Sequence, residues 1–306
     1  MIIPNKLKKG DTIGVIAPSN PIINENVEEI EKAKHIIEKL GYKVKYSKNL
    51  FSNTNKYSAT AEERAEDLNE MFCDKEVKMI WCAKGGENSN SLFEYINYEQ
   101  IKQNPKIICG YSDITSITNI ITEKTGLVTF SGTNFKTIAT DESDYSLKEA
   151  LKRFKDENIE LGTSSDKYIT IRSGKAKGKL IGGNLSLTRG LVSGKYSIDF
   201  TDKILFLEEL GFETGPALVS NYLYYLKQND VFEKIKGIWI GNYTHESGIK
   251  LEDILLDTIK DEYRFPIIKS ETFGHIETKT VIPIGIEAEI DTSTERKIKL
   301  LESCVK

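Results

Sequence analysis

Short apolar runs alternate with segments of helical periodicity over the first half of the chain, and this order constrains the fold more than any other feature. Residues 12–17 form an apolar run, and apolar residues then recur at helical spacing from 27 to 40. A capping box, Thr60-Ala61-Glu62-Glu63, predicts a second helix that ends near Cys73, and further strands are predicted at 42–46, 77–82 and 107–109. Strands that alternate with helices predict a parallel, Rossmann-like α/β domain.

The pattern weakens between residues 141 and 178, where polar and small residues predominate. We therefore predict an N-terminal α/β domain at 1–155, an inter-domain connection at 156–178, and a C-terminal domain of mixed strands and helices at 179–306. In the C-terminal domain, strands are predicted at 179–181, 204–207, 237–240 and 282–285, and helices near 185–191 and 216–228. Ligands of parallel sheets gather at the carboxyl ends of the strands, which points to the loops after residues 17, 83, 110 and 130.

The charge and cysteine content argue against several classes of protein. The 306 residues carry 42 basic and 46 acidic side chains, a net charge of −4, whereas nucleic-acid binding favours a basic surface. The four cysteines, Cys73, Cys82, Cys109 and Cys304, show no CxxC spacing, and no Cys/His cluster has the spacing of a zinc site. No segment approaches ~18 apolar residues, and the N-terminus lacks the apolar core of a signal peptide. We expect a cytoplasmic protein in a reducing compartment, with neither a nucleic-acid polymer nor a membrane as partner.

One strand is followed by a serine in a setting that favours chemistry. The apolar run at 107–109 leads into Gly110-Tyr111-Ser112-Asp113, after which a helix is predicted to begin. A serine on a sharp strand-to-helix turn is held where a substrate can reach it, as in a nucleophile elbow. Ser112 is therefore the candidate nucleophile of a serine hydrolase, which also needs a base, an orienting acid and an oxyanion hole.

The chain offers three histidines as the base that a serine nucleophile requires. His35 lies within a predicted helix, which favours a surface position. His245 follows a predicted strand, so its loop could be functional. His275 follows Gly274, and a glycine allows the backbone to approach a site closely, so we favour His275 without excluding the alternatives.

The candidate acid follows the apolar run at 204–207, where Glu208 and Glu209 stand together. A carboxylate directly after a buried strand is costly unless it has a partner. We expect Glu208 to be the buried member of the pair and Glu209 to reach water.

Backbone N–H groups for an oxyanion hole could come from two places. One donor is the residue after the nucleophile, Asp113, and the other is the turn Gly85-Gly86, which could equally be a plain strand-to-helix turn. Gly182-Gly183-Asn184 could bind an anion, although a helix cap at Asn184 is the more common role of such a residue.

Six segments together resemble the LD-carboxypeptidase and microcin C immunity family of serine peptidases. They are GDTIGVIAPS at 10–19, AKGGENSNSLFEYINYE at 83–99, GYSDIT at 110–115, GGNLS at 182–186, LFLEEL at 205–210 and FGHIETKTVIPIG at 273–285. The resemblance implies two domains and a Ser-His-Glu triad in which Ser112 is the nucleophile, Glu208 the acid and His275 the base. It also implies a cytoplasmic enzyme, often a homodimer, that needs no metal or other cofactor.

The resemblance leaves two substrate classes open. The segment at 83–99 is more similar to the microcin immunity branch, which cleaves a peptidyl or aminoacyl group from a nucleotide-like group. The other branch removes a terminal D-alanine from muropeptide tetrapeptides. The immunity branch stacks the nucleobase on a tryptophan of the inter-domain loop, where this chain has Tyr168 instead. Candidate substrate-binding residues are Lys84, Asn88, Tyr168 and Asn184, and Lys84 or Arg172 could bind a substrate carboxylate.

Two rival functions belong to other classes. A non-catalytic protein that binds peptides or small molecules could use the same two-domain scaffold without an aligned triad. A cysteine hydrolase could use Cys109, but Cys109 lies inside an apolar run, where a cysteine behaves as a small hydrophobic residue.

Overall fold

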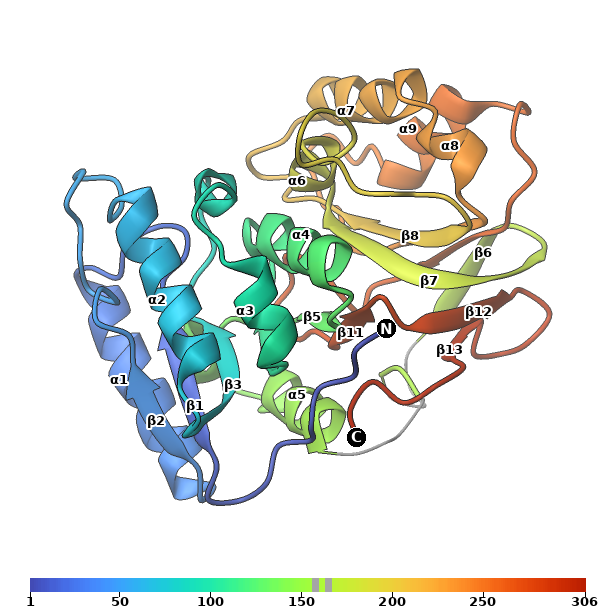
Figure 1. Ribbon diagram of the computed structural model, residues 1–306. Coiled ribbons are helices and arrows are strands. Elements are labelled where there is room, and N and C mark those ends of the chain that lie inside the picture. The colour runs from blue at the N-terminus through green and yellow to red at the C-terminus, as the bar shows by residue number, and fades with distance from the viewer. Residues whose placement is uncertain (156–159, 163–166) are drawn as a thin grey trace.

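The first sheet is built mainly from the strands of the N-terminal half (Figure 1). The structure is a computed structural model that describes residues 1–155, 160–162 and 167–306. Within them the strand order is β11-β5-β4-β3-β1-β2, formed by β1 (Thr12–Ile16), β2 (Lys43–Tyr46), β3 (Val77–Cys82), β4 (Ile107–Gly110), β5 (Thr129–Ser131) and β11 (Ile282–Ile284). All neighbours are parallel except β11, which runs antiparallel to β5. The predicted α/β fold class is confirmed.

Helices cover both faces of this sheet because strand side chains point alternately to its two sides. The helices are α1 (Glu25–Lys39), α2 (Ala61–Cys73), α3 (Tyr98–Gln103), α4 (Ile114–Thr125) and α5 (Tyr145–Lys155), with 3-10 turns η1 (Ser89–Leu92) and η2 (Phe135–Ala139). Helices α1 and α5 and turn η2 share one apolar cluster, whereas α2, α3 and α4 share the other. Helix α2 begins with the predicted capping box, in which the Glu63 carboxylate accepts the N–H of Thr60 at 2.8 Å.

The second sheet has a parallel centre and antiparallel edges. Its order is β13-β12-β7-β8-β9-β10-β6, formed by β6 (Tyr168–Arg172), β7 (Lys175–Asn184), β8 (Lys203–Glu208), β9 (Gly237–Ile240), β10 (Ile267–Ser270), β12 (Glu287–Asp291) and β13 (Ile298–Leu300). Helices α6 (Leu185–Arg189), α7 (Pro216–Gln228), α8 (Val231–Lys234) and α9 (Leu251–Ile259) lie together on one side of the sheet, at the top of Figure 1. Strand β8 lies at the middle of the sheet, and it ends at Glu208.

Part of the segment predicted to connect the domains forms strands. Residues 168–172 are β6, an edge strand antiparallel to β10, and β7 already begins at Lys175. The sequence concealed the start of β7 because residues 175–178 are small or basic, and this stretch is held in the sheet by pairing with β12. Residues 156–159 and 163–166 of the predicted connection lie outside the described residues. The predicted domain boundaries stay a prediction.

The two sheets are held together by contacts from both halves of the chain. Strand β11 comes from the C-terminal half but completes the edge of the first sheet beside β5. Helix α4, which follows Ser112, lies against β7, where the Asn119 amide accepts the N–H of Gly182 at 3.1 Å and donates to its carbonyl at 2.8 Å. Gly183 permits this approach, since a Cβ there would lie 2.6 Å from the Thr115 hydroxyl oxygen. The strand ends of both sheets are thereby brought to one site.

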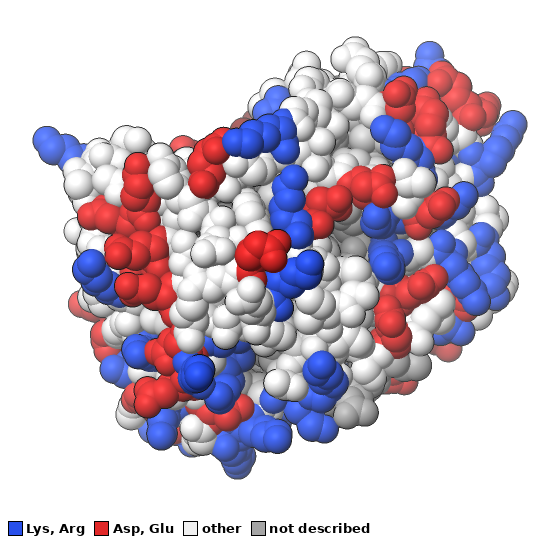
Figure 2. Space-filling view, in the orientation of Figure 1, with Lys and Arg blue, Asp and Glu red and all other residues white. Residues whose placement is uncertain are grey.

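Charges of both signs are distributed over the molecular surface. Figure 2 shows lysine and arginine interspersed with aspartate and glutamate on the visible face, without a broad patch of one sign. This distribution agrees with the small net charge of −4. Within the described ranges, we find no helix whose length and apolar character would allow it to span a membrane.

Candidate active site

Ser112 lies on a strained turn between β4 and α4. Its φ is +64°, in the left-handed region that is sterically unfavourable for residues other than glycine. Gly110, two residues before Ser112, has no room for a side chain, because a Cβ there would lie 2.8 Å from Ile114. The Tyr111 N–H donates to the Asn134 side chain at 3.1 Å, which fixes the turn from the neighbouring strand. This conformation is that of a nucleophile elbow.

Three side chains from distant parts of the chain form one hydrogen-bonded series. The hydroxyl of Ser112 lies 3.1 Å from Nε2 of His275, although the two residues are 163 positions apart. Nδ1 of His275 lies 2.7 Å from Oε2 of Glu208, which also accepts the His275 backbone N–H at 3.2 Å. Both distances are in the range that proton transfer from a serine through an oriented histidine requires.

Gly274 allows the loop of His275 to pass close to the end of β8. Its φ is +113°, and a Cβ at this position would lie 2.9 Å from the Glu208 Cβ and 3.0 Å from Oε2. A side chain here would therefore displace the carboxylate that contacts His275.

Replacing Gly274 with alanine is expected to lower kcat/KM by about 10²-fold, because the added methyl separates Glu208 from His275. Steady-state kinetics and thermal unfolding are the measurements. Gly10→Ala is the matched control, since Gly10 also has a positive φ, +90°, but a Cβ there would have no neighbour within 4 Å. The control should lose stability and keep activity, whereas equal losses of activity in both variants would contradict the role of Gly274.

Opposing effects act on the imidazole of His275. Burial lowers the pKa of His275, but the negative charges of Glu208 and Glu209 and the hydrogen bond to Glu208 leave this pKa above its ordinary value of 6.5. The positive charge of Lys279 lowers the pKa of His275 in turn. The ring is therefore a stronger base than a free histidine.

Glu209 is buried beside Glu208, although the sequence predicted that it would reach water. Only 2% of its surface is exposed. Its carboxylate accepts the Asn184 amide at 2.9 Å and the N–H groups of Ser186 and Leu210, each at 2.8 Å. Burial and the neighbouring Glu208 charge raise the pKa of Glu209. These three donors, contributed by the tertiary structure, explain how a second carboxylate can be buried here.

Two adjoining hollows of about 280 and 240 Å³ flank the serine. Both are lined by Gly86, Ser112, Leu210 and His275. The first hollow also has lining residues from the loops after β1, β3 and β5, as a site at the carboxyl ends of parallel strands requires: Asn20, Lys84, Asn134 and Lys136. The second has lining residues from the end of β7, from α6 and from the loop after β8: Asn184, Ser186, Arg189, Glu209 and Thr214. A substrate that crosses Ser112 would occupy both hollows.

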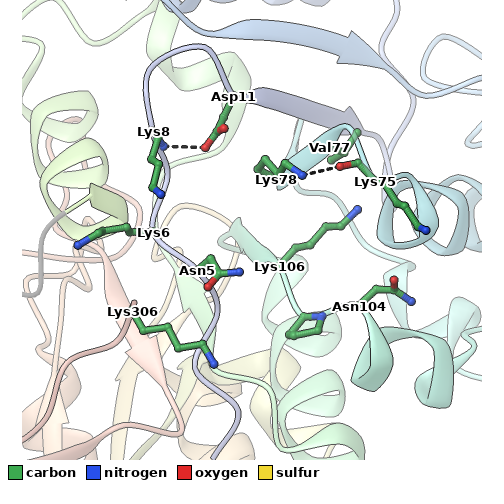
Figure 3. A pocket seen from close by; sticks show the side chains of 11 residues that line it. Asn5, Lys6, Lys8, Asp11, Lys75, Val77, Lys78, Asn104, Lys106 and Lys306 are labelled. Atoms are coloured by element: carbon green, nitrogen blue, oxygen red, sulfur yellow. Dashed lines mark hydrogen bonds between the residues drawn. The ribbon is translucent and has the colours of Figure 1, made fainter.

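A basic hollow lies at the opposite end of the first sheet, where β1, β3 and β4 begin (Figure 3). It measures about 600 Å³ and is lined by six lysines, namely Lys6, Lys8, Lys75, Lys78, Lys106 and Lys306. The side chains of Lys6 and Lys75 point to opposite sides in Figure 3 rather than toward a common point. Ser112, Glu208 and His275 do not line this hollow.

The predicted oxyanion donors lie beside the serine. A Cβ on Gly85 would lie 2.9 Å from the Ser112 Cβ, so the Gly85-Gly86 turn passes directly along Ser112. Within the described residues, the N–H groups of Gly86 and Asp113 donate no hydrogen bond to the protein. Asp113 itself is buried, and its carboxylate accepts the Ser19 hydroxyl and the Ser89 N–H. These hydrogen bonds fix Asp113 in place, and the N–H groups of Gly86 and Asp113 stay available to a ligand.

Two lysines line the first hollow, and among the residues that the structure describes only Lys136 has a carboxylate partner. Lys136 pairs with Glu29 at 3.2 Å, whereas the Lys84 ammonium donates to the Asn26 amide oxygen at 2.8 Å. Burial and the nearby charge of Lys136 lower the pKa of Lys84. An anionic group of a substrate would relieve this repulsion.

Three of the other predicted residues do not line either hollow. The Asn88 side chain accepts a hydrogen bond from Arg64 and donates one to the Ser58 hydroxyl. Tyr168 lies in edge strand β6, and Arg172 of the same strand donates to the carbonyls of Lys260 and Tyr263. Asn184 does line the second hollow, and its side chain also accepts the Leu187 N–H as a helix cap.

The side chains considered for rival chemistry are not placed for it. His35 is exposed on α1, and His245 binds Ser247 in its own loop. Cys109 is fully buried, and burial raises the pKa of its thiol, which opposes formation of a thiolate nucleophile. We find no group of three or more His, Cys, Asp or Glu that could hold a metal ion in the described part of the chain.

The fold and the site together define the class of the protein. It is an α/β protein of the hydrolase class, with a serine on the sharp turn between a strand and a helix. The chain belongs to the LD-carboxypeptidase family: residues 13–132 match its N-terminal domain and residues 177–290 its C-terminal domain. The chain is 33% identical to the probable murein peptide carboxypeptidase of Bacillus subtilis, over 96% of this chain and 93% of that protein. It is 29% identical to the microcin C7 self-immunity protein MccF of Escherichia coli, over 93% of this chain and 92% of that protein.

Solved structures of similar proteins share the whole fold. The MccF-like protein of Bacillus anthracis has a TM-score of 0.89 and 33% identity, covering 99% of this chain and 100% of its own. MccF in complex with glutamyl sulfamoyl guanosine has a TM-score of 0.91 and 26% identity, covering 100% of both chains. MccF has also been solved in complex with aspartyl sulfamoyl adenosine. The predicted family is thereby confirmed.

Proposed function

We propose that this protein is a serine carboxypeptidase-type amide hydrolase that works through an acyl-enzyme. The observation that carries the proposal is the series Ser112–His275–Glu208, with the serine on a left-handed turn between two hollows. Aligned side chains of this kind are needed for nucleophilic catalysis, whereas a protein that only binds its ligand does not need them.

The reaction begins with proton transfer from Ser112 to Nε2 of His275 as the serine oxygen attacks the amide carbonyl carbon. The N–H groups of Asp113 and of the Gly85-Gly86 turn stabilise the oxyanion that forms. His275, oriented by Glu208, then gives the proton to the leaving nitrogen, and the acyl group stays on Ser112. A water molecule, deprotonated by His275, attacks the ester, and the carboxylic acid product leaves with Ser112 restored.

The substrate that we favour is a peptidyl or aminoacyl group joined to a nucleotide-like group. The support comes from the MccF structures that hold aminoacyl sulfamoyl nucleosides and resemble this chain over its full length. Lys84 and Lys136 in the first hollow suit an anionic leaving group of such a substrate. Asn184 and Glu209 line the second hollow, which would receive the acyl part.

A murein peptide is the second candidate substrate. The relative from Bacillus subtilis named as a probable murein peptide carboxypeptidase is more similar in sequence than MccF of Escherichia coli. In addition, Tyr168, predicted to stack on a nucleobase, does not line either hollow. A terminal D-alanine carboxylate would equally suit the lysines of the first hollow.

A side-by-side assay distinguishes the two substrates. We expect the purified protein to hydrolyse an aminoacyl sulfamoyl adenosine faster than a muropeptide tetrapeptide, with both activities lost in Ser112→Ala. Preference for the tetrapeptide would select the second candidate. Failure on both substrates, together with no labelling of Ser112 by an active-site serine probe, would select a non-catalytic binding protein. The homodimer and the cytoplasmic location implied by the resemblance stay predictions.

A further inference from the structure

Lys279 is a buried lysine on the loop that carries His275, and the reaction described above does not use it. Its side chain is only 2% exposed. Burial lowers the pKa of Lys279 to about 8. Its ammonium forms no ion pair within 4.0 Å in the part of the chain that the structure describes. An unpaired charge in a protein interior costs stability, so the side chain calls for a physical explanation.

The ammonium of Lys279 contacts two groups that adjoin the catalytic histidine. It donates a hydrogen bond to the carbonyl of Ile276 at 2.5 Å, next to His275 in the chain. It also lies 4.6 Å from the centre of the Tyr111 ring, within cation–π range. The Tyr111 ring in turn meets the His275 imidazole edge-on, with ring centres 5.3 Å apart. Lys279 therefore contacts both the loop that carries His275 and the aromatic ring that packs against the imidazole.

The backbone around Lys279 is fixed to helix α5. The Lys279 N–H donates to the Ser146 hydroxyl at 3.1 Å, and that hydroxyl donates to the carbonyl of Glu277 at 3.4 Å. The next residue, Thr280, donates its hydroxyl to the Glu149 carboxylate at 3.1 Å. The loop is therefore held by α5, which packs on the first sheet, and this fixes the position of the Lys279 ammonium against the Tyr111 ring.

Charged groups of both signs face the imidazole from several elements. Two carboxylates at the end of β8, Glu208 and Glu209, favour the protonated ring, and Lys279 opposes them. Tyr111, on the turn after β4, stays a neutral phenol because burial, followed by the Glu208 charge, raises its pKa to about 12. Four further charged residues line the first hollow together with His275: Lys84, Glu87, Lys136 and Glu213. Lys279 is thus the positively charged residue that acts on the imidazole from the loop that carries His275.

We propose that Lys279 is a positioning residue that fixes the Tyr111 ring and the His275 loop through its hydrogen bond to Ile276 and its contact with the Tyr111 ring, and that its positive charge opposes protonation of His275. This charge acts against the charges of Glu208 and Glu209, which favour the protonated ring. This inference rests on the proposed function for its catalytic meaning, but its effect on the charge of His275 can be measured without any substrate.

Two variants of the full chain separate the charge of Lys279 from its hydrogen bond. Lys279→Met removes both, whereas Lys279→Gln keeps a donor that can reach toward Ile276. An NMR titration of the His275 ring, assigned by its loss in His275→Ala, should move to higher pH in both variants. The acid side of the kcat/KM profile should move in the same direction, with a loss of about tenfold at pH 6 relative to the unchanged protein.

Stability and a matched control exclude a merely structural role. Both variants should unfold at the same temperature as the unchanged protein or higher, because an unpaired buried charge has been removed. Lys34→Met is the control, because the Lys34 ammonium also lies over an aromatic ring, 4.9 Å from the Tyr46 ring centre, but on α1, which does not line either hollow. This variant should alter neither the His275 titration nor kcat/KM.

Unchanged His275 titration in both Lys279 variants would overturn the inference. A shift in Lys279→Met alone would overturn the role of the charge, since that result would assign the effect to the hydrogen bond. A His275 titration that moves as expected in a protein inactive on both substrates would leave the inference standing and reject the proposed function instead.

Discussion

Ser112→Ala is expected to lower kcat/KM for amide hydrolysis by about 10⁴-fold or more, because alanine offers no oxygen to form the acyl-enzyme. The hydroxyl that is lost lies 3.1 Å from Nε2 of His275, and the rest of the hydrogen-bonded series is untouched. The backbone already tolerates a Cβ at this turn, so the fold should persist. Steady-state kinetics on the better substrate, with thermal unfolding of the same samples, measures both expectations.

Two further variants, Ser116→Ala and Ser112→Gly, test whether the loss of activity is specific to the Ser112 hydroxyl. Ser116→Ala, in the first turn of the helix that follows Ser112, should retain activity. Ser112→Gly should be inactive yet at least as stable as Ser112→Ala, because glycine adopts the φ of +64° found here without the strain that a Cβ brings. Turnover by Ser112→Ala close to that of the unchanged protein would reject the assignment of the nucleophile.

Glu208→Gln is expected to lower kcat/KM by about 10³-fold. The amide can keep its place beside Nδ1 but carries no charge to stabilise the imidazolium that forms during the reaction. The variant should also change the pH dependence, because the Glu208 charge helps to raise the pKa of His275. The ring must be neutral to accept a proton, so activity is lost as pH falls through this pKa. Removing the charge lowers the pKa and moves the acid limb of kcat/KM to lower pH.

Glu209→Gln provides the comparison, because the two glutamates are adjacent and both are buried. Glu209 accepts Asn184, Ser186 and Leu210 but not His275, so its loss should affect kcat/KM less than the loss of Glu208. A greater loss in Glu209→Gln, with Glu208→Gln close to normal, would show that the orienting acid had been assigned to the wrong residue. The kinetic pH profiles of both variants decide between these outcomes.

The strands and helices of the first sheet were predictable because their patterns are local. Apolar runs bounded by turns gave the strands β1 to β4, and the capping box at Thr60 marked the beginning of α2. The start of β7 was missed, since its small and basic residues carry no apolar alternation and its pairing with β12 joins segments about a hundred residues apart. The burial of Glu209 was missed for the same reason, because its three hydrogen-bond donors are assembled by the fold.

The sequence by itself determined the parallel α/β order of the first half and the strand–Gly–x–Ser turn, since both depend on neighbouring residues. The resemblance implied His275 and Glu208, but only the tertiary structure brought His275 between Ser112 and Glu208, because these contacts join the turn after β4, the end of β8 and the loop after β10. It also placed Lys279 under Tyr111 and moved Tyr168 away from the hollows. Local periodicity specifies elements, whereas the protonation and position of a catalytic group depend on charges and contacts that exist only once distant segments pack together.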